Sequence, residues 1–197
     1  MDKNNIIEIA NKNNGYLYKD LIKEYGIDTI YITRLVKENK LTKVSRGIYI
    51  TDQGVSDFMY IMHLKYSNLI FSGETALYLN GLSKKREPNY EAFVPYGTNI
   101  QKIDSLSIKY TRKDTFDLGA ELIDTAFRNK VKCYNRERCI CDLFVRSNIY
   151  TIEDKAYAIT TYKKKYLNLE KLYEYATELG VLDLVKKEFE NIWKIIN

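Results

Sequence analysis

The stretch that decides the fold covers residues 28–50 and reads DTIYITRLVKENKLTKVSRGIYI. Asp28 is a good N-cap, because its carboxylate accepts hydrogen bonds from the exposed amides of a first helical turn. After it, Ile32, Leu35 and Val36 recur at helical spacing and form an apolar stripe. The stretch therefore predicts a helix that starts directly after Asp28 and packs this stripe against a core.

A tight hairpin is predicted directly after this helix. Leu41 and Val44 indicate one short strand, and Ile48 and Ile50 indicate the next. The dipeptide Arg46-Gly47 separates them, and glycine can adopt the positive φ that such turns require. We therefore expect a small basic β-hairpin, or wing, beside the helix.

Two further helical segments precede Asp28. Ile6 and Ala10 mark the first, and Leu21 marks the second. Gly26 suits the left-handed position that ends a helix. Two short helices joined by a glycine-containing turn form a helix-turn-helix, whose second helix lies in the major groove of DNA. Together with the hairpin, the first fifty residues predict a winged helix-turn-helix.

Positive charge is concentrated in this region. Residues 29–50 contain five basic residues and one acidic residue, whereas the whole chain has a formal net charge of +5. Arginine and threonine can read base edges, and basic residues of a wing can contact phosphates. The predicted DNA-binding residues are Thr29, Tyr31, Thr33, Arg34, Lys37, Lys40, Lys43 and Arg46. The alternative is a small helical domain with a solvated basic edge.

The rest of the chain predicts a mixed α/β domain with a helical C-terminal tail, so the expected fold class is α+β. Short strands are expected near 69–71, 90–96, 106–110, 120–127 and 130–134, and helices near 52–68, 72–79, 135–145, 151–165, 168–179 and 182–193. The best boundary lies around residues 51–54. We therefore expect two domains, 1–54 and 55–197.

A second basic surface is a candidate in the C-terminal domain. Asn135 is expected to cap a helix whose apolar stripe includes Leu143, which would leave Arg136 and Arg138 at least partly exposed. With Lys163, Lys164 and Lys165 they could meet nucleic acid or another acidic partner. The alternative is a solvated face at helix ends, where a helix dipole also favours lysine.

No catalytic constellation is recognised, and we expect a non-enzymatic protein. The single histidine, His63, lies in a helical pattern and is expected to be structural. The glycines form neither a dinucleotide-binding motif nor a P-loop. Asp117, Glu121 and Asp124 could suggest a metal-dependent nuclease, but surface carboxylates around strands are the better interpretation. No metal and no cofactor are expected.

The cysteines and the N-terminus indicate a cytoplasmic protein. Three cysteines, at positions 133, 139 and 141, are an odd number and fit reduced thiols. Residues 1–10 lack the basic and apolar regions of a signal peptide. No stretch approaches the roughly 18 consecutive apolar residues of a membrane span.

Three motifs resemble those of AbiE-system antitoxins. Residues 71–82, FSGETALYLNGL, are similar to the helix motif that follows the winged domain in that family. Residues 131–143, VKCYNRERCICDL, resemble its strand-to-helix signature, with Cys139 in place of the common threonine. Residues 169–179 resemble its late helix. The resemblance covers nearly the full length of the chain.

The resemblance implies a two-domain antitoxin of a bacterial abortive-infection, type IV toxin–antitoxin system that confers phage resistance. In such proteins the winged domain binds inverted repeats in the operon's own promoter and represses it. The C-terminal antitoxin domain counteracts a nucleotidyltransferase-like toxin without a stable complex and contributes to cooperative operator binding.

Two alternatives remain open at this stage. One is a plain winged-helix transcriptional regulator without antitoxin activity. The other is an enzyme, such as a nuclease, that uses the winged domain to reach DNA. A nucleotidyltransferase gene immediately downstream would favour the antitoxin.

Overall fold

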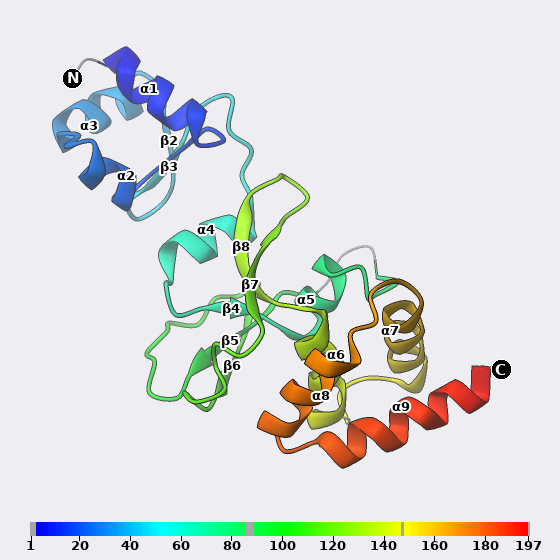
Figure 1. The fold of residues 1–197 in the computed structure, drawn as a ribbon. Coiled ribbons are helices and arrows are strands. Elements are labelled where there is room, and N and C mark those ends of the chain that lie inside the picture. The colour runs from blue at the N-terminus through cyan, green and yellow to red at the C-terminus, as the bar shows by residue number, and fades with distance from the viewer. Residues whose placement is uncertain (1–2, 86–88, 147, 197) are drawn as a thin grey trace. The chain divides into compact units, whose positions relative to one another are not determined.

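The computed structural model describes residues 3–85, 89–146 and 148–196 (Figure 1). These residues form nine helices and eight strands, and the strands make two sheets. The predicted α+β class is confirmed at this level. Among the described residues, no helix is both long and apolar enough to cross a membrane.

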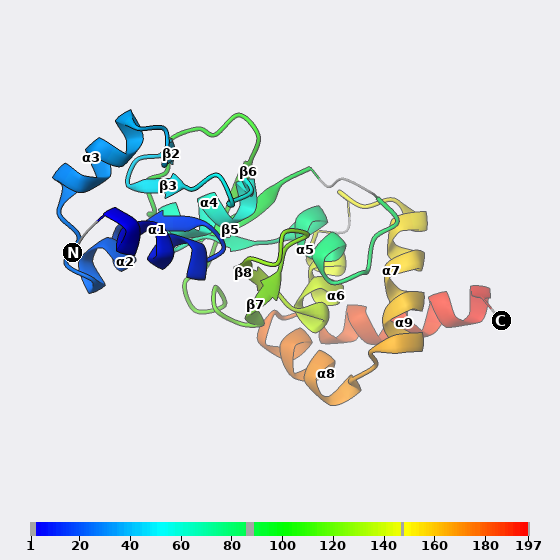
Figure 2. The same ribbon diagram turned by 90° about the horizontal axis from the view of Figure 1, so that it is seen from above.

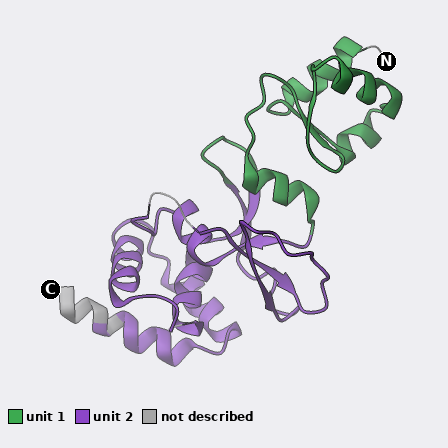
Figure 3. Cartoon of the chain, turned by 180° about the vertical axis from the view of Figure 1, so that it is seen from behind, with its two compact units in different colours: residues 1–67, 124–130 green, residues 68–123, 131–197 purple. Residues whose placement is uncertain are grey.

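The chain divides into two compact units (Figure 3). Unit 1 comprises residues 1–67 together with 124–130, and unit 2 comprises residues 68–123 and 131–197. The short segment 124–130 is the tip that connects two strands of the larger sheet. The predicted domain boundary after residue 54 stays a prediction.

Unit 1 contains four helices and a three-stranded antiparallel sheet of order β1-β3-β2. Its elements are α1 (Lys3–Lys12), β1 (Tyr16–Tyr18), α2 (Lys19–Glu24), α3 (Thr29–Lys37), β2 (Thr42–Ser45), β3 (Ile48–Ile50) and α4 (Phe58–Lys65). The three predicted helices before residue 40 and both strands of the hairpin are confirmed. The helix expected at 52–68 is shorter, because Asp57 caps it.

The core of unit 1 is built from the apolar stripes that the sequence indicated. Ile6, Leu21, Ile32 and Leu35 are buried in one cluster with Leu41. β1 was not predicted: it has only three residues, too few to show an alternating pattern, and it pairs with β3 from residues far away in the sequence. This pairing adds β1 to the hairpin as the third strand of the sheet.

Two glycines shape the segment around α3. Gly26 has a φ of 59°, and the amide of Ile27 closes α2 on the carbonyl of Ile22 at 2.9 Å, which is the expected left-handed helix end. Gly47 has a φ of 73° in the turn between β2 and β3. The side chain of Asp28 accepts a hydrogen bond from the amide of Ile30 at 2.8 Å, so the predicted cap is present.

Asp57 holds the 124–130 tip to the rest of unit 1. Asp57 is buried, and only 1% of its surface is exposed. Oδ2 accepts hydrogen bonds from Thr125 Oγ1 at 2.5 Å and from Asn129 Nδ2 at 2.9 Å. Oδ1 accepts from the amides of Met59 and Tyr60 at the start of α4. One buried carboxylate therefore fixes both a helix end and a distant loop.

Unit 2 is built on a five-stranded sheet of order β6-β5-β4-β8-β7. Strand β5 pairs antiparallel with β4 and parallel with β6, and β4 pairs parallel with β8. The strands are β4 (Ile70–Phe71), β5 (Glu91–Pro95), β6 (Ser107–Thr111), β7 (Ala120–Asp124) and β8 (Lys130–Tyr134). All five agree with the predicted strand positions.

Five helices accompany this sheet: α5 (Gly73–Leu79), α6 (Arg136–Val145), α7 (Ile152–Lys165), α8 (Leu169–Glu178) and α9 (Leu182–Ile196). The predicted cap Asn135 accepts a hydrogen bond from an amide of the first turn, and Thr151 and Asn168 do likewise. Ser72 precedes α5 at the cap position, but its hydroxyl makes no capping bond.

Helix α6 is central to unit 2. It contacts α5, α7, α8 and α9, and two views show these helices around it (Figures 1 and 2). Residues 137–144 are consequently all buried, the polar ones included. The sequence had predicted a helix with one buried face and one exposed face.

The three cysteines are free and buried in unit 2. Burial raises the pKa of the Cys141 thiol to about 12 and raises the pKa of Cys133 and Cys139 as well. A thiol with a raised pKa is a poor nucleophile at neutral pH. The cysteines therefore act as small core residues.

Candidate nucleic-acid interface

Helix α3 presents a continuous exposed face. Ile32 and Leu35 point into the core of unit 1, and the side chains opposite them are exposed to solvent. The exposed residues are Thr29, Ile30, Thr33, Arg34 and Lys37. Their positions repeat at intervals of four, so they lie along one side of the helix. This face carries most of the predicted base-contacting residues.

Local contacts orient several of these side chains. Thr33 Oγ1 donates a hydrogen bond to the carbonyl of Thr29 at 2.9 Å, and this bond holds the exposed side chain against its own helix. The guanidinium of Arg34 lies 5.9 Å from the centroid of the half-buried Tyr31 ring. The Tyr31 ring therefore contacts the Arg34 guanidinium, and Tyr31 is only partly available to a ligand.

The remaining predicted residues lie beyond α3. Lys40 is exposed in the turn after the helix, Lys43 is exposed on β2, and Arg46 is exposed in the turn between β2 and β3. Unit 1 thus brings together the helix and hairpin residues that the sequence singled out.

Glu38, the single acidic residue of the segment 29–50, forms an ion pair with a lysine from α1. Glu38 forms an ion pair and hydrogen bond with Lys3, and this interaction lowers the pKa of Glu38. Lys40 and Arg34 act in the same direction. Because Glu38 is engaged by Lys3, it compensates less of the positive charge on α3 and the hairpin.

Ile30 is a candidate contact that the sequence reasoning missed. It is 55% exposed in the first turn of α3, beside Thr29. An apolar side chain near the start of a recognition helix can contact the methyl group of thymine. The signal was present in the sequence, because Ile30 falls off the stripe formed by Ile32 and Leu35.

The second predicted surface requires a correction at Arg138. This arginine is 2% exposed and not partly exposed as expected. Its Nε donates to Asp142 Oδ1 at 3.0 Å, and its Nη1 donates to the carbonyls of Thr115 and Leu118. Burial opposes its charge, but the Asp142 carboxylate outweighs this effect and raises the pKa of Arg138. Arg138 is a buried structural cation, because the segment between β6 and β7 lies against its guanidinium and accepts hydrogen bonds from it.

The other members of that surface divide into engaged and exposed residues. Arg136 is half-buried, with its guanidinium 4.0 Å from the Tyr166 ring centroid. Lys163 Nζ donates to the carbonyl of Phe189 at 2.7 Å. Lys164 and Lys165 are exposed at the end of α7. The structure therefore leaves these two lysines as the solvent-facing part of the predicted surface.

Three of the residues weighed for catalysis have structural contacts. His63 is half-buried and stacks on Tyr60, with ring centroids 6.2 Å apart. Glu121 pairs with Lys171 at 3.1 Å, and Asp124 pairs with Lys130 at 3.5 Å. Within the described parts of the chain, no group of three or more His, Cys, Asp or Glu residues is placed to hold a metal ion.

A family model described as a transcriptional regulator, the AbiEi antitoxin, matches residues 17–51. This segment runs from β1 to the residue after β3 and includes the whole of α3. It is less than a fifth of the chain. The match supports the resemblance over this segment, whereas the motifs at 71–82, 131–143 and 169–179 lie outside it.

A search of solved structures shows a similar fold in the RV2827C protein from Mycobacterium tuberculosis. The TM-score is 0.55 at 11% sequence identity, and the similarity covers 91% of this chain and 75% of that chain. At this identity the likeness concerns the fold alone. A search of curated proteins gave no match.

Proposed function

We propose that unit 1 is a winged helix-turn-helix module that binds duplex DNA, with α3 as the recognition helix and the β2–β3 hairpin as the wing. The exposed α3 face carries the proposal: threonines, Ile30 and Arg34 stand opposite a buried stripe, and Lys43 and Arg46 follow on the hairpin. The match of residues 17–51 to a transcriptional-regulator family supports it.

The chemistry of these side chains suits two kinds of contact. Arg34 and the threonines could read base edges, since arginine pairs with guanine and threonine offers a hydroxyl or a methyl group. Lys37, Lys40, Lys43 and Arg46 would contact phosphates, which position the protein without reading sequence. Binding that depends on several phosphate contacts weakens steeply as salt rises.

We further propose that the chain is the cytoplasmic antitoxin and autorepressor of a type IV system. The resemblance of its motifs to AbiE-system antitoxins supports this role, as does the family match over 17–51. In this role it binds inverted repeats in its own promoter and counteracts a nucleotidyltransferase-like toxin without a stable complex. We propose that residues 55–197 carry the antitoxin activity and that no enzymatic step is involved.

A gel-shift titration of the full chain on its own promoter fragment tests the DNA-binding role. The double variant Arg34→Ala with Arg46→Ala should lose specific binding. The matched control, Lys12→Ala with Lys65→Ala, removes the same charge from exposed positions outside α3 and the hairpin and should bind as the unchanged protein does. Equal loss in both variants would show that only net charge matters and would reject α3 as the recognition helix.

A rescue experiment tests the antitoxin role separately. Cells that express the cognate nucleotidyltransferase-like toxin should survive when they also express the Arg34→Ala, Arg46→Ala variant, although that variant should no longer repress. If repression and rescue are lost together in a variant of normal abundance, the two activities do not separate. If the unchanged protein represses and never rescues, the chain is a plain regulator.

A further inference from the structure

We propose that unit 2 binds a small phosphorylated molecule in a cleft between the edge of its sheet and α6. The cleft has a volume of about 450 Å³ and is lined by residues of β5, β6, the segment after β6, α6 and the end of α8. Small-molecule sites commonly have volumes of roughly 300–1,000 Å³. The site is independent of the DNA-binding role proposed for unit 1.

The cleft has an excess of positive charge. Its lining residues include four cations, Lys109, Arg112, Arg138 and Arg146, and one carboxylate, Asp142. Asp142 is committed to Arg138, at 3.0 Å. An anionic ligand would therefore meet three cations that this carboxylate does not neutralise.

Two further carboxylates pair with these cations. Asp114 lies 3.5 Å from Arg112 Nε, but both side chains are exposed, and a surface pair of this kind contributes little. Glu91 is shared between Lys109 and Arg146. Its Oε1 lies 3.7 Å from Lys109 Nζ and also forms an ion pair with Arg146. Glu91 sits on β5 and is 7% exposed. Since one carboxylate cannot balance two cations, positive charge remains on this side of the cleft.

The sheet register explains why these cations converge. Phe93 of β5 is paired with Lys109 of β6, so both side chains lie on the same face of the sheet. The guanidinium of Arg146 lies over the Phe93 ring, 5.1 Å from its centroid. Lys109 on the edge strand and Arg146 at the end of α6 therefore flank the same aromatic wall.

Arg146 also has an unused donor. Its Nη1 bonds to Glu91, whereas its Nη2 is buried and has no hydrogen-bond partner among the described residues. Buried donors in folded proteins almost always have a partner. The forked guanidinium matches phosphate oxygens, and a small rotation of Arg146 toward the cleft would give Nη2 such an acceptor.

The walls indicate that the ligand is more than a free anion. Phe93, Val145 and Leu179 supply apolar surface, and Thr111 and Thr115 supply polar groups. Sites with apolar walls and a few convergent charged groups are typical for small organic ligands. A phosphorylated molecule of about the size of a mononucleotide fits this combination.

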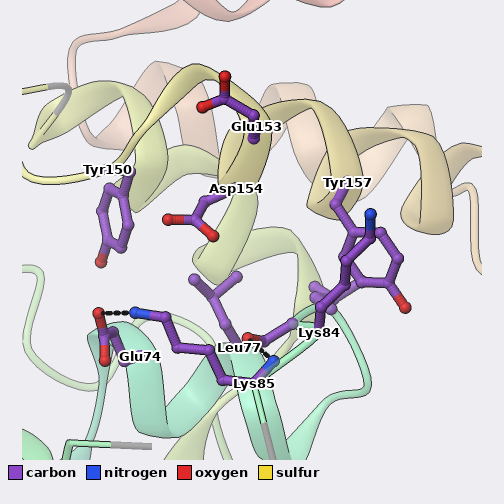
Figure 4. A pocket seen from close by; sticks show the side chains of 10 residues that line it. Glu74, Leu77, Lys84, Lys85, Tyr150, Glu153, Asp154 and Tyr157 are labelled. Atoms are coloured by element: carbon purple, nitrogen blue, oxygen red, sulfur yellow. Dashed lines mark hydrogen bonds and ion pairs between the residues drawn. The ribbon is translucent and has the colours of Figure 1, made fainter.

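A second cavity in unit 2 lacks the features of an anion-binding site (Figure 4). Its volume is about 70 Å³, which leaves room for only a few water molecules. Its charges are mixed: Lys85 forms an ion pair with Glu74, and Glu153 and Asp154 also line it. Neither its size nor its charge favours an anionic ligand.

Calorimetric titration of the full chain at low ionic strength tests the proposal, with four probes: adenosine monophosphate, adenosine, inorganic phosphate and a single-stranded oligonucleotide. The variant Lys109→Glu with Arg112→Glu reverses two cations at the rim of the cleft. The control, Lys102→Glu with Lys187→Glu, makes the same change in net charge at exposed positions outside the lining. Circular dichroism verifies that both variants are folded.

We expect adenosine monophosphate to bind and adenosine to bind far more weakly. The cleft variant should lose affinity by about tenfold or more, because hydrogen bonds to charged groups contribute that much, while the control keeps its affinity. If inorganic phosphate binds as tightly as the nucleotide, the ligand of the cleft is free phosphate and not a phosphorylated organic molecule.

Three results would overturn the proposal. The first is that neither phosphate probe binds at millimolar concentration. The second is that the cleft variant and the control lose binding equally. The third is that only a single-stranded oligonucleotide binds and the cleft variant alone loses it, which would make the cleft a nucleic-acid surface.

Discussion

Arg34 and Arg138 are both helical arginines that the sequence placed on candidate nucleic-acid surfaces, yet the structure gives them opposite environments. Arg34 is exposed on α3, and its guanidinium lies over the Tyr31 ring, 5.9 Å from the centroid. Arg138 is 2% exposed and is bonded to Asp142 and two carbonyls. A cation with committed donors stabilises the fold, whereas an exposed one is available to a partner.

The largest effect should follow from replacing Arg138. Arg138→Met leaves Asp142 buried without its partner, and breaking a buried ion pair in this way costs about 3–5 kcal/mol of unfolding free energy. Arg34→Met should change stability by less than about 0.5 kcal/mol, because it lies on the surface. Urea unfolding of the two variants side by side gives both values.

A double variant separates the loss of the charge pair from the loss of the hydrogen bonds to the Thr115 and Leu118 carbonyls. Arg138→Met with Asp142→Leu removes both charges and should recover much of the stability, since apolar replacement of a buried pair is often neutral. A double variant no more stable than Arg138→Met would instead assign the effect to the bonds with Thr115 and Leu118.

The sequence could predict α3 well because its core stripe and its cap are local signals. Asp28 caps the helix through an amide two residues away, and Ile32 and Leu35 are one turn apart. The exposed face then follows from the geometry of a single helix. This is why all eight predicted DNA-contacting residues fall on α3, the following turn or the hairpin.

The burial of Arg138 could not be predicted in the same way. It depends on the segment between β6 and β7, where the carbonyls of Thr115 and Leu118, 23 and 20 residues earlier in the sequence, accept hydrogen bonds from its guanidinium. The spacing of Arg138 and Asp142, four residues apart, was a local hint of an intrahelical pair. Such a pair occurs far more often on a helix surface, so the hint did not reveal burial.

A second contrast concerns two aspartates that both cap helices. Asp57 is buried and accepts four hydrogen bonds, whereas Asp28 is exposed and caps α3 through Ile30. Asp57→Ala should cost about 2–3 kcal/mol, because a cap is lost and buried donors are left unsatisfied. Asp28→Ala should cost about 1 kcal/mol.

Thermal and urea unfolding of these two variants would measure the difference. Asp57→Asn is a useful intermediate, since the amide oxygen can keep some of the bonds while the charge is lost. Equal losses for Asp57→Ala and Asp28→Ala would show that the bonds to Thr125 and Asn129 contribute nothing to the stability of unit 1.

The exposed arginine should matter for DNA rather than for folding. Arg34→Ala should weaken binding to the cognate operator by about 1–3 kcal/mol if Arg34 reads a base, and it should reduce the preference for that site over unrelated DNA. Lys43→Ala should weaken binding to all DNA alike and lower the dependence on salt. Titrations on cognate and scrambled duplexes at several salt concentrations distinguish the two patterns.

The smallest effect is expected at the lysines that end α7, where three neighbours have different environments. Lys164 and Lys165 are exposed, so Lys164→Glu with Lys165→Glu should change stability by no more than about 0.5 kcal/mol, apart from a small loss at the helix C-terminus. Lys163→Ala should cost more, about 1 kcal/mol, because it removes the bond to the Phe189 carbonyl. A Lys163 variant as stable as the unchanged protein would make all three a solvated face. If the Lys164, Lys165 reversal is stable and impairs rescue from the toxin, these two lysines meet an acidic partner, and unit 2 then has its own exposed counterpart of Arg34.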